Sequence, residues 1–263
     1  MQPMQPDPTA SAFAVRGLTK VYGDKAVVDH LNLDVPRGSI YGIVGPNGAG
    51  KTTMLGMATG LIRPTEGDAY IWGHNMWADP IAAKSAMGLL VDDLPVFDRL
   101  SAVGALRGMD PAVVQQRSAE LLDALGLADA GTKQVVDFSA GMTKKMLLAL
   151  ALLHSPDVLV LDEPLEAVDP VSGRVIQQIL RSFAASGGTV VLSSHVMELV
   201  EGLCDHVAII DHGKVLVAGH VDEVRQGQSL SDIFVSYVGG GTLDEGSLAW
   251  LHSEQQGNGG GQS

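Results

Sequence analysis

One short segment constrains the fold of this 263-residue chain more than any other. Its residues, in order, are Gly45, Pro46, Asn47, Gly48, Ala49, Gly50, Lys51 and Thr52. An apolar run typical of a buried strand (SIYGIVG) leads into it, and a helical pattern (MLGMATGL) follows it. Glycines at this spacing let the backbone curl so that successive N–H groups face phosphate oxygens, and the helix N-terminus adds positive potential. The segment therefore predicts a nucleotide phosphate loop, with Lys51 on the β- and γ-phosphates and Thr52 on Mg²⁺.

Two acids follow another buried apolar run, DVLVLDE, at its carboxyl end. Asp162 is placed to hold the Mg²⁺ shell, and Glu163 is the candidate base that orients or deprotonates an attacking water. His195 ends the next run, VVLSSH, where its side chain can reach the γ-phosphate side of the same site. A single histidine at a strand end is more often structural, but the neighbouring Ser193 and Ser194 favour a phosphate sensor.

The order of the remaining segments predicts an α/β fold with a mixed sheet core. Two runs near the N-terminus, FAVRGLTKVY and AVVDHLNLDV, alternate and predict an antiparallel β subdomain. A helical segment lies between DVLVLDE and GTVVLSSH, so these runs predict parallel strands, and HVAIID with KVLVAG predicts a closing hairpin. We expect one domain over residues 13–238, with a helical subdomain at about 93–145, a disordered tail over 1–12 and a flexible Gly-rich tail over 239–263.

Composition excludes several classes of protein. The net charge of −13 argues against nucleic acid as a partner, because proteins that bind phosphate backbones usually carry a basic face. A single cysteine, Cys204, rules out an internal disulfide framework and fits a reducing compartment. No apolar run reaches the ~20 residues needed to span a bilayer, and the first residues do not resemble a signal peptide. We therefore expect a cytoplasmic protein.

Five motifs, in order, resemble those of the nucleotide-binding subunit of ATP-binding cassette (ABC) transporters. They are GPNGAGKTT, which ends at Thr53, the signature-like FSAGM at 138–142, VLVLDEP, the turn Ala167-Val168-Asp169, and His195. The resemblance covers nearly all of 13–238 and implies the P-loop NTPase fold of ABC ATPases. The later phrase HVMELVEGLCDHVAIIDHGKVLVAG looks most like ATPases of drug and polysaccharide exporters.

The resemblance also implies a mechanism and partners. Two ATP-binding subunits, identical or paralogous, would pair head to tail with two MgATP molecules between them. Ser139 and the backbone N–H of Gly141 would then close over the γ-phosphate bound by the opposite chain. Tyr22 would stack on adenine, and Asp169 would link the two sites across the dimer. An integral-membrane permease would be the further partner, which would place this chain on the cytoplasmic face of the cell membrane.

Four features of the sequence depart from the family pattern. Ala140 replaces the first of two glycines in the signature, and Asp92 stands where the family usually has a glutamine that contacts Mg²⁺ and water. We expect Asp92 to serve as a further Mg²⁺ ligand. Leu165 and Glu166 replace small or polar residues. The stretch from Asp92 to Phe138 also looks one helix short, around SAVGALRGMDP.

Two alternative functions follow from these features. One is a soluble ABC ATPase that is not coupled to transport. The other is a regulatory nucleotide clamp with little turnover, a reading that Asp92 and Ala140 keep open and that Glu163 and His195 oppose.

Overall fold

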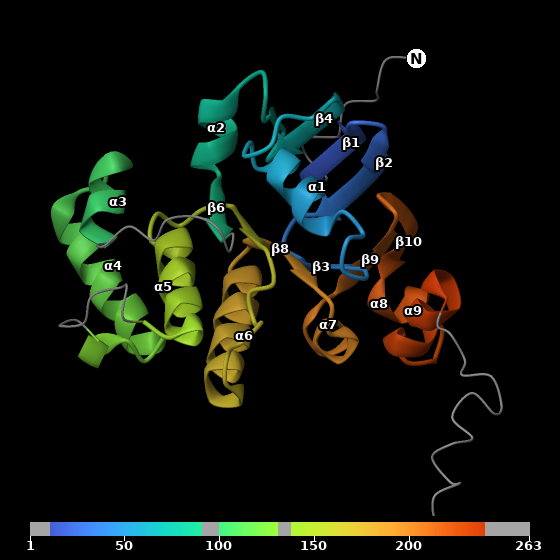
Figure 1. Ribbon diagram of the computed structural model, residues 1–263. Coiled ribbons are helices and arrows are strands. Elements are labelled where there is room, and N and C mark those ends of the chain that lie inside the picture. Colours follow the sequence, from blue (N-terminus) through green and yellow to red (C-terminus); the bar gives the residue numbers. More distant parts are fainter. Residues whose placement is uncertain (1–10, 91–99, 131–137, 240–263) are drawn as a thin grey trace, which may run out of the picture.

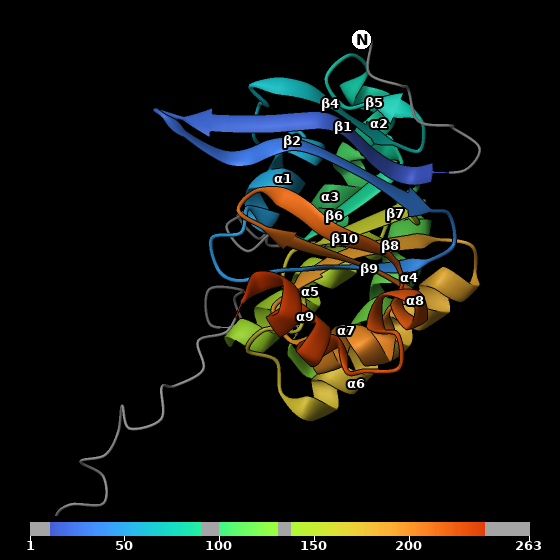
Figure 2. The same cartoon turned by 90° about the vertical axis from the view of Figure 1, so that its right-hand side faces the viewer.

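The computed structural model describes residues 11–90, 100–130 and 138–239. Within these ranges the strands form two sheets, one of four strands and one of six. Helix α1 (Lys51–Ala58) lies between the two sheets, and further helices cover the far face of the larger sheet (Figures 1 and 2). Among the helices of these ranges, none has both the length and the apolar character that crossing a bilayer requires.

The smaller sheet is the expected antiparallel β subdomain. Its strand order is β2-β1-β4-β5, and the strands are β1 (Ser11–Tyr22), β2 (Lys25–Pro36), β4 (Glu66–Ile71) and β5 (His74–Asn75). Strands β1 and β2 pair antiparallel, as the alternation of their sequences predicts. Phe13 and Val15 of β1 pack in one apolar cluster with Met54 and Met57 of α1. The smaller sheet is thereby fixed above the helix that follows the glycine-rich loop.

The larger sheet has the order β10-β9-β3-β8-β7-β6. Its strands are β3 (Ile40–Val44), β6 (Met87–Leu90), β7 (Val158–Leu161), β8 (Thr189–Ser194), β9 (His206–Asp211) and β10 (Lys214–His220). All neighbouring pairs are parallel except β9 and β10, which form the predicted hairpin. Every residue of β3, β7 and β8 is buried, which explains the apolar runs in these strands.

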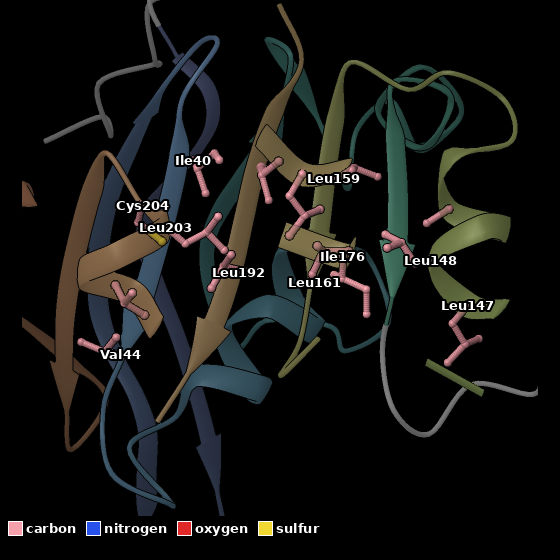
Figure 3. Close-up of a cluster of buried hydrophobic side chains, with 14 of the residues drawn as sticks. Ile40, Val44, Leu147, Leu148, Leu159, Leu161, Ile176, Leu192, Leu203 and Cys204 are labelled. Carbon is pink, nitrogen blue, oxygen red and sulfur yellow. The ribbon is translucent and has the colours of Figure 1, made fainter. Parts of the chain in front are cut away.

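Helices α5 (Ala140–Leu152), α6 (Pro170–Ala185) and α7 (Met197–Leu203) cover the outer face of this sheet. Their apolar side chains meet those of the strands in one buried cluster (Figure 3). Leu148 of α5, Ile176 of α6 and Leu203 of α7 each belong to it, together with Leu161 and Leu192 from the strands. Helix α6 connects β7 to β8, so the predicted parallel strand–helix–strand unit is confirmed.

A helical region forms one side of the molecule (Figure 1). It contains α3 (Leu100–Leu106), α4 (Pro111–Ala124), a 3₁₀ turn (Ala128–Ala130) and α5. The expectation that a helix is missing around SAVGALRGMDP is wrong, because most of that segment forms α3. Leu100 is buried there, and Gly104 lets α3 approach Val114 of α4 closely. Short helices α2 (Pro80–Ser85), α8 (Val221–Arg225) and α9 (Leu230–Val238) complete the described chain.

Candidate active site

The glycine-rich loop connects the end of β3 to the first residue of α1, as its sequence predicts. Gly50 caps α1 with a φ of 100°, and a Cβ at this position would lie 2.6 Å from the carbonyl oxygen of Val27. Only glycine meets both conditions. Because Gly50 supplies no side-chain cap, an anion in front of the helix is a natural partner for the first-turn amides.

Lys51 is buried at the base of this loop. Its Nζ donates hydrogen bonds to the carbonyl oxygens of Gly45, at 2.7 Å, and Pro46, at 3.2 Å. Burial lowers the pKa of Lys51, and the nearby carboxylates of Glu163 and Asp162 act in the opposite direction. Two loop carbonyls therefore hold the ammonium group of Lys51, and the carboxylates of Asp162 and Glu163, which follow β7, attract it.

A cleft of about 320 Å³ opens beside the loop. Its walls bring together most of the predicted nucleotide-binding residues with the two acids and the histidine. The lining residues are Val27, Asn47, Gly48, Ala49, Gly50, Lys51, Thr52, Thr53, Asp162, Glu163, Glu166 and His195. The carboxyl ends of parallel strands β3, β7 and β8 meet at one edge of the sheet, which is why segments far apart in sequence converge here.

The two acids after β7 have different surroundings. Asp162 is buried and accepts a hydrogen bond from the hydroxyl of Ser193 on β8. The Ser193 oxygen in turn accepts the backbone N–H of Glu163 at 3.0 Å. Glu163 has a φ of 45°, an unusual left-handed conformation for a residue with a side chain. Its Oε1 lies 3.1 Å from Nδ1 of His195, so the two candidate catalytic side chains are neighbours.

Three residues singled out from the family resemblance lie outside this cleft. Ser139 caps α5 and accepts the backbone N–H of Met142 at 3.2 Å. Gly141, in the first turn of α5, faces the carbonyl oxygen of Ala167. Asp169 caps α6, and hydrogen bonds from Ser172 and Val171 lower the pKa of its carboxyl group.

Asp169 lines a second cleft, of about 490 Å³, which shares Glu163, Glu166 and His195 with the first. The two clefts are therefore adjacent, and the residues that follow β7 line both of them.

Tyr22 and Asp92 stand apart from these groups. Tyr22 is half exposed at the end of β1, with Nζ of Lys20 5.0 Å from its ring centre, and it is not among the residues that line the cleft. Asp92 lies outside the described residues. The proposed roles of both residues remain predictions from the sequence.

The sequence reasoning missed two residues that contact the acids. Ser193 was noted only as a polar neighbour of His195, although it links Asp162 to the backbone of Glu163. Lys144 was not singled out from the sequence, yet its Nζ donates to the backbone carbonyl of Glu163. A signal for Lys144 existed, because it precedes the buried Leu148 and Ala151 by four and seven positions, which puts it on the buried face of α5.

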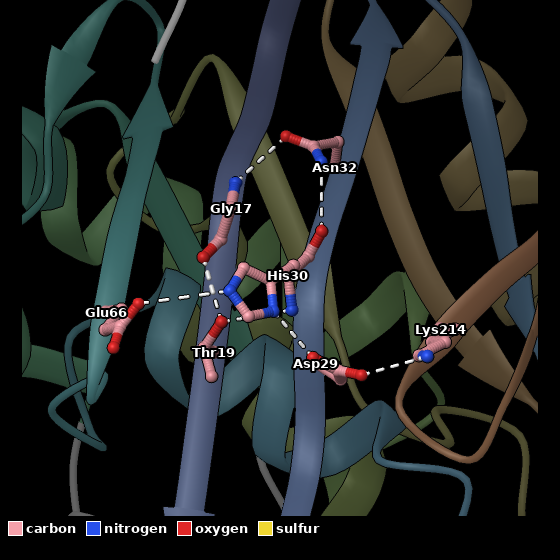
Figure 4. Close-up of polar contacts among 7 residues, drawn as sticks. All are labelled: Gly17, Thr19, Asp29, His30, Asn32, Glu66 and Lys214. Atoms are coloured by element: carbon pink, nitrogen blue, oxygen red, sulfur yellow. Dashed lines mark hydrogen bonds and ion pairs between the residues drawn. The ribbon is translucent and has the colours of Figure 1, made fainter. Parts of the chain in front are cut away.

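The turn between β9 and β10 is hydrogen-bonded to the phosphate loop and holds it in place. The N–H of Gly213 donates to the carbonyl of Ala49 at 2.9 Å, and the carbonyl of Gly213 accepts the N–H of Asp29 at 3.0 Å. An ion pair of 3.0 Å between Lys214 and Asp29 reinforces this join, and Asp29 also contacts His30 on β2 (Figure 4). The loop is thus tied through one turn to both sheets.

The residues of the cleft fit a magnesium nucleotide. The left-handed glycines and the uncapped start of α1 form a cradle of backbone amides, and Lys51 adds a positive charge at its base. Thr52 in the first turn of α1 and Asp162 after β7 also line the cleft and offer hydroxyl and carboxylate oxygens, the ligands that Mg²⁺ prefers. The cleft therefore has the chemistry expected of a nucleotide-hydrolysing site.

A model of the ABC transporter family matches residues 28–166 of the chain. A solved structure described as the ATP-binding subunit of an ABC transporter superposes with a TM-score of 0.80 and 25% sequence identity. That match covers 86% of this chain and 99% of the other. The chain therefore belongs to the ABC transporter family, as one of its ATP-binding proteins that hydrolyse ATP.

Particular relatives are named for resistance, export and transport. The daunorubicin/doxorubicin resistance ATP-binding protein DrrA of Streptomyces peucetius is 36% identical over 228 residues, which are 84% of this chain and 69% of that protein. The Nod factor export ATP-binding protein I of Cupriavidus metallidurans is 34% identical, over 85% of this chain and 76% of its own length. The lantibiotic transport ATP-binding protein SrtF of Streptococcus pyogenes is 31% identical, over 85% of this chain and 96% of its own.

Proposed function

We propose that this chain powers the export of a substrate through a separate membrane-spanning permease, on the cytoplasmic face of the cell membrane. The observation that carries the proposal is the convergence of the phosphate loop, Asp162, Glu163 and His195 on one cleft. The export direction is supported by relatives that are themselves named for drug resistance and Nod factor export.

Each residue of the cleft has a role in this proposal. The loop amides and Lys51 bind the phosphates, while Thr52 and Asp162 would hold Mg²⁺, which neutralises charge on the phosphate oxygens when bound. Glu163 orients a water and accepts its proton as the water oxygen attacks the γ-phosphorus. The bond from that phosphorus to the bridging oxygen breaks, which releases ADP and phosphate. His195 holds the carboxylate of Glu163 and contacts the γ-phosphate from the neighbouring strand.

We propose that the second half of the site comes from another ATP-binding subunit, which pairs head to tail with this one. Ser139 and Gly141 lie at the N-terminus of α5, where backbone amides favour an anion. They lie outside the cleft of their own chain, which supports a role at the nucleotide of the opposite chain. Closure of the pair on ATP and its reopening after hydrolysis would drive the permease.

Serine-to-alanine substitution at two helix caps tests the pairing. Ser139→Ala and Ser229→Ala each remove a hydroxyl that accepts an amide at the start of a helix, α5 and α9 respectively. Both variants should lose about 1 kcal/mol of stability. Only Ser139→Ala should also lower ATP hydrolysis and ATP-induced dimerisation, followed by light scattering. Equal hydrolysis rates in the two variants would exclude the role of Ser139 at a partner's nucleotide.

Co-purification tests the coupling to transport. The chain is isolated from detergent-solubilised membranes of its own host, and its stoichiometric partners are identified. A multi-spanning membrane protein, without a separate solute-binding protein, is the expected result. A soluble partner, or no partner together with comparable ATPase activity, would support instead an ABC ATPase that is not coupled to transport.

A further inference from the structure

A buried lysine joins helix α5 to the loop that carries Glu163. The side chain of Lys144 is only 9% exposed, and its Nζ donates a hydrogen bond of 2.5 Å to the backbone carbonyl of Glu163. The same Nζ lies 3.7 Å from Oε2 of Glu166, three residues further along that loop. The ammonium group therefore contacts the loop after β7 at two points.

The carbonyl that accepts from Lys144 belongs to a residue with an unusual backbone conformation. Glu163 is not glycine, yet it has a φ of 45°, and such a conformation persists only where surrounding contacts enforce it. Three hydrogen bonds flank this residue: its N–H donates to Ser193, and its carbonyl accepts from Nζ of Lys144 and, at 3.2 Å, from the backbone N–H of Glu166. The resulting turn directs the carboxylate of Glu163 toward His195 and the cleft.

Glu166 provides the negative charge that a buried ammonium needs. Its side chain is 51% exposed and lines both clefts, so it reaches Lys144 from the solvent side. The contact supplies a reason for an acid at this position, where the family pattern has a small or polar residue. The ammonium group of Lys144 thus contacts the carbonyl of Glu163 and the carboxylate of Glu166.

We propose that Lys144 is a positioning residue for ATP hydrolysis: it holds the turn at Glu163, and Glu166 holds the ammonium of Lys144. The inference rests on the proposed role of Glu163 as the residue that activates water. Lys144 is not among the residues that line the first cleft, and in this scheme it acts on hydrolysis through the backbone of Glu163.

The first test separates turnover from binding. Lys144→Gln should lower kcat by about 10- to 100-fold, because small misplacements of a catalytic group cost that much, while KM and the affinity for ATP stay within about twofold. Lys144→Arg keeps a cationic donor and should recover most of kcat. Equal kcat values in the wild type and Lys144→Gln, or loss of ATP affinity in proportion to kcat, would overturn the proposal.

A double-mutant cycle tests the part played by Glu166. Glu166→Gln should lower kcat by only about threefold, since the ion pair is half exposed, and should have no further effect in the Lys144→Gln background. The same effect of Glu166→Gln in both backgrounds would show that Glu166 acts on the nucleotide directly and not through Lys144. Because Glu166 is at the surface, its variant remains informative if Lys144→Gln does not fold.

Two controls distinguish the possible failures. Arg117→Gln removes another cation that donates to a backbone carbonyl, that of Leu153 at the far end of α5, and should change stability but not kcat. Glu163→Gln tests the underlying assignment. If Glu163→Gln leaves hydrolysis unchanged, the proposed role of Glu163 fails. If Glu163→Gln abolishes hydrolysis and Lys144→Gln does not affect it, only the role of Lys144 fails.

Discussion

Nδ1 of His195 lies 3.1 Å from Oε1 of Glu163, across the carboxyl ends of the neighbouring strands β8 and β7. The glutamate side chain is 17% exposed and the histidine side chain 45%, so the acid lies deeper in the cleft and the imidazole covers it. The contact is an ion pair whenever the imidazole carries a proton on both nitrogens.

Glu163→Gln should lower ATP hydrolysis by about 10²- to 10⁴-fold, because the amide cannot take a proton from water. Nucleotide binding should persist, since the side chain keeps its size and the phosphate loop is untouched. Phosphate release and the binding of a fluorescent ATP analogue measure the two effects. Glu198→Gln, an exposed glutamate on α7, is the matched control and should hydrolyse ATP at the wild-type rate. Equal rates near zero for all three proteins would favour the nucleotide clamp with little turnover, whereas equal high rates would remove Glu163 from the reaction.

Lys51→Gln should weaken the binding of ATP by about 10- to 100-fold, the equivalent of about 1.5–3 kcal/mol for lost charge-assisted hydrogen bonds. Titration calorimetry measures the affinity. Burial lowers the pKa of Lys51, so the affinity of the wild type should begin to fall at a lower alkaline pH than an exposed lysine would give. Lys84→Gln removes an exposed lysine on α2 and should leave the affinity unchanged. Full affinity in Lys51→Gln would remove the lysine from the phosphate site.

His154 should make the protein less stable in mild acid. Burial, together with the charges of Arg107 and Arg117, lowers the pKa of His154 to about 4. Nε2 contacts the carbonyl of Met87 at 3.1 Å, whereas Nδ1 is buried without a hydrogen-bond partner among the described residues. As pH falls from about 6.5 to about 4, His154 is protonated in the unfolded chain but stays neutral in the folded protein. The free energy of unfolding therefore decreases over this range.

The decrease attributable to His154 should be about 2–3 kcal/mol, allowing for partial exposure of the ring. His154→Gln keeps a donor for the Met87 carbonyl and should lose that much less stability over the same pH range. Urea unfolding at several pH values measures the difference. His74→Gln, at the surface, should follow the wild-type curve. If His154→Gln also follows it, the histidine is not the cause of the acid sensitivity.

Gly213→Ala should weaken both stability and the affinity for ATP. Gly213 has a φ of 76°, and a Cβ there would lie 2.5 Å from the carbonyl oxygen of Val27. The backbone must therefore shift at the turn that holds Ala49 of the phosphate loop. Gly126→Ala is the matched control, because Gly126 has a φ of 63° with open space around it, and should cost stability alone, about 1–2 kcal/mol. Equal ATP affinities in the two variants would contradict the bracing of the loop.

The sequence was sufficient to predict the elements that carry the site. Lys51, Asp162 and Glu163 stand in unmistakable local contexts, at the ends of apolar runs, and parallel strands bring such ends together. The hydrogen bonds that position the residues after β7 could not be predicted from the sequence. The hydrogen bonds of Ser193 and Lys144 to the segment after β7 depend on strand register and helix rotation, which an apolar pattern leaves undetermined. Helix α3 was missed because its seven residues are too few to show a clear period.

The bracing of the phosphate loop by Gly213 has a consequence for the order in which the protein is made. Strands β9 and β10 are the last strands of the described chain to leave the ribosome, whereas the phosphate loop is among the first segments. A nascent chain that has reached the end of β8 therefore contains the whole loop but lacks the amide that holds the carbonyl of Ala49. The phosphate loop therefore gains its hydrogen bond from Gly213 only after β9, β10 and the turn between them have been synthesised and folded.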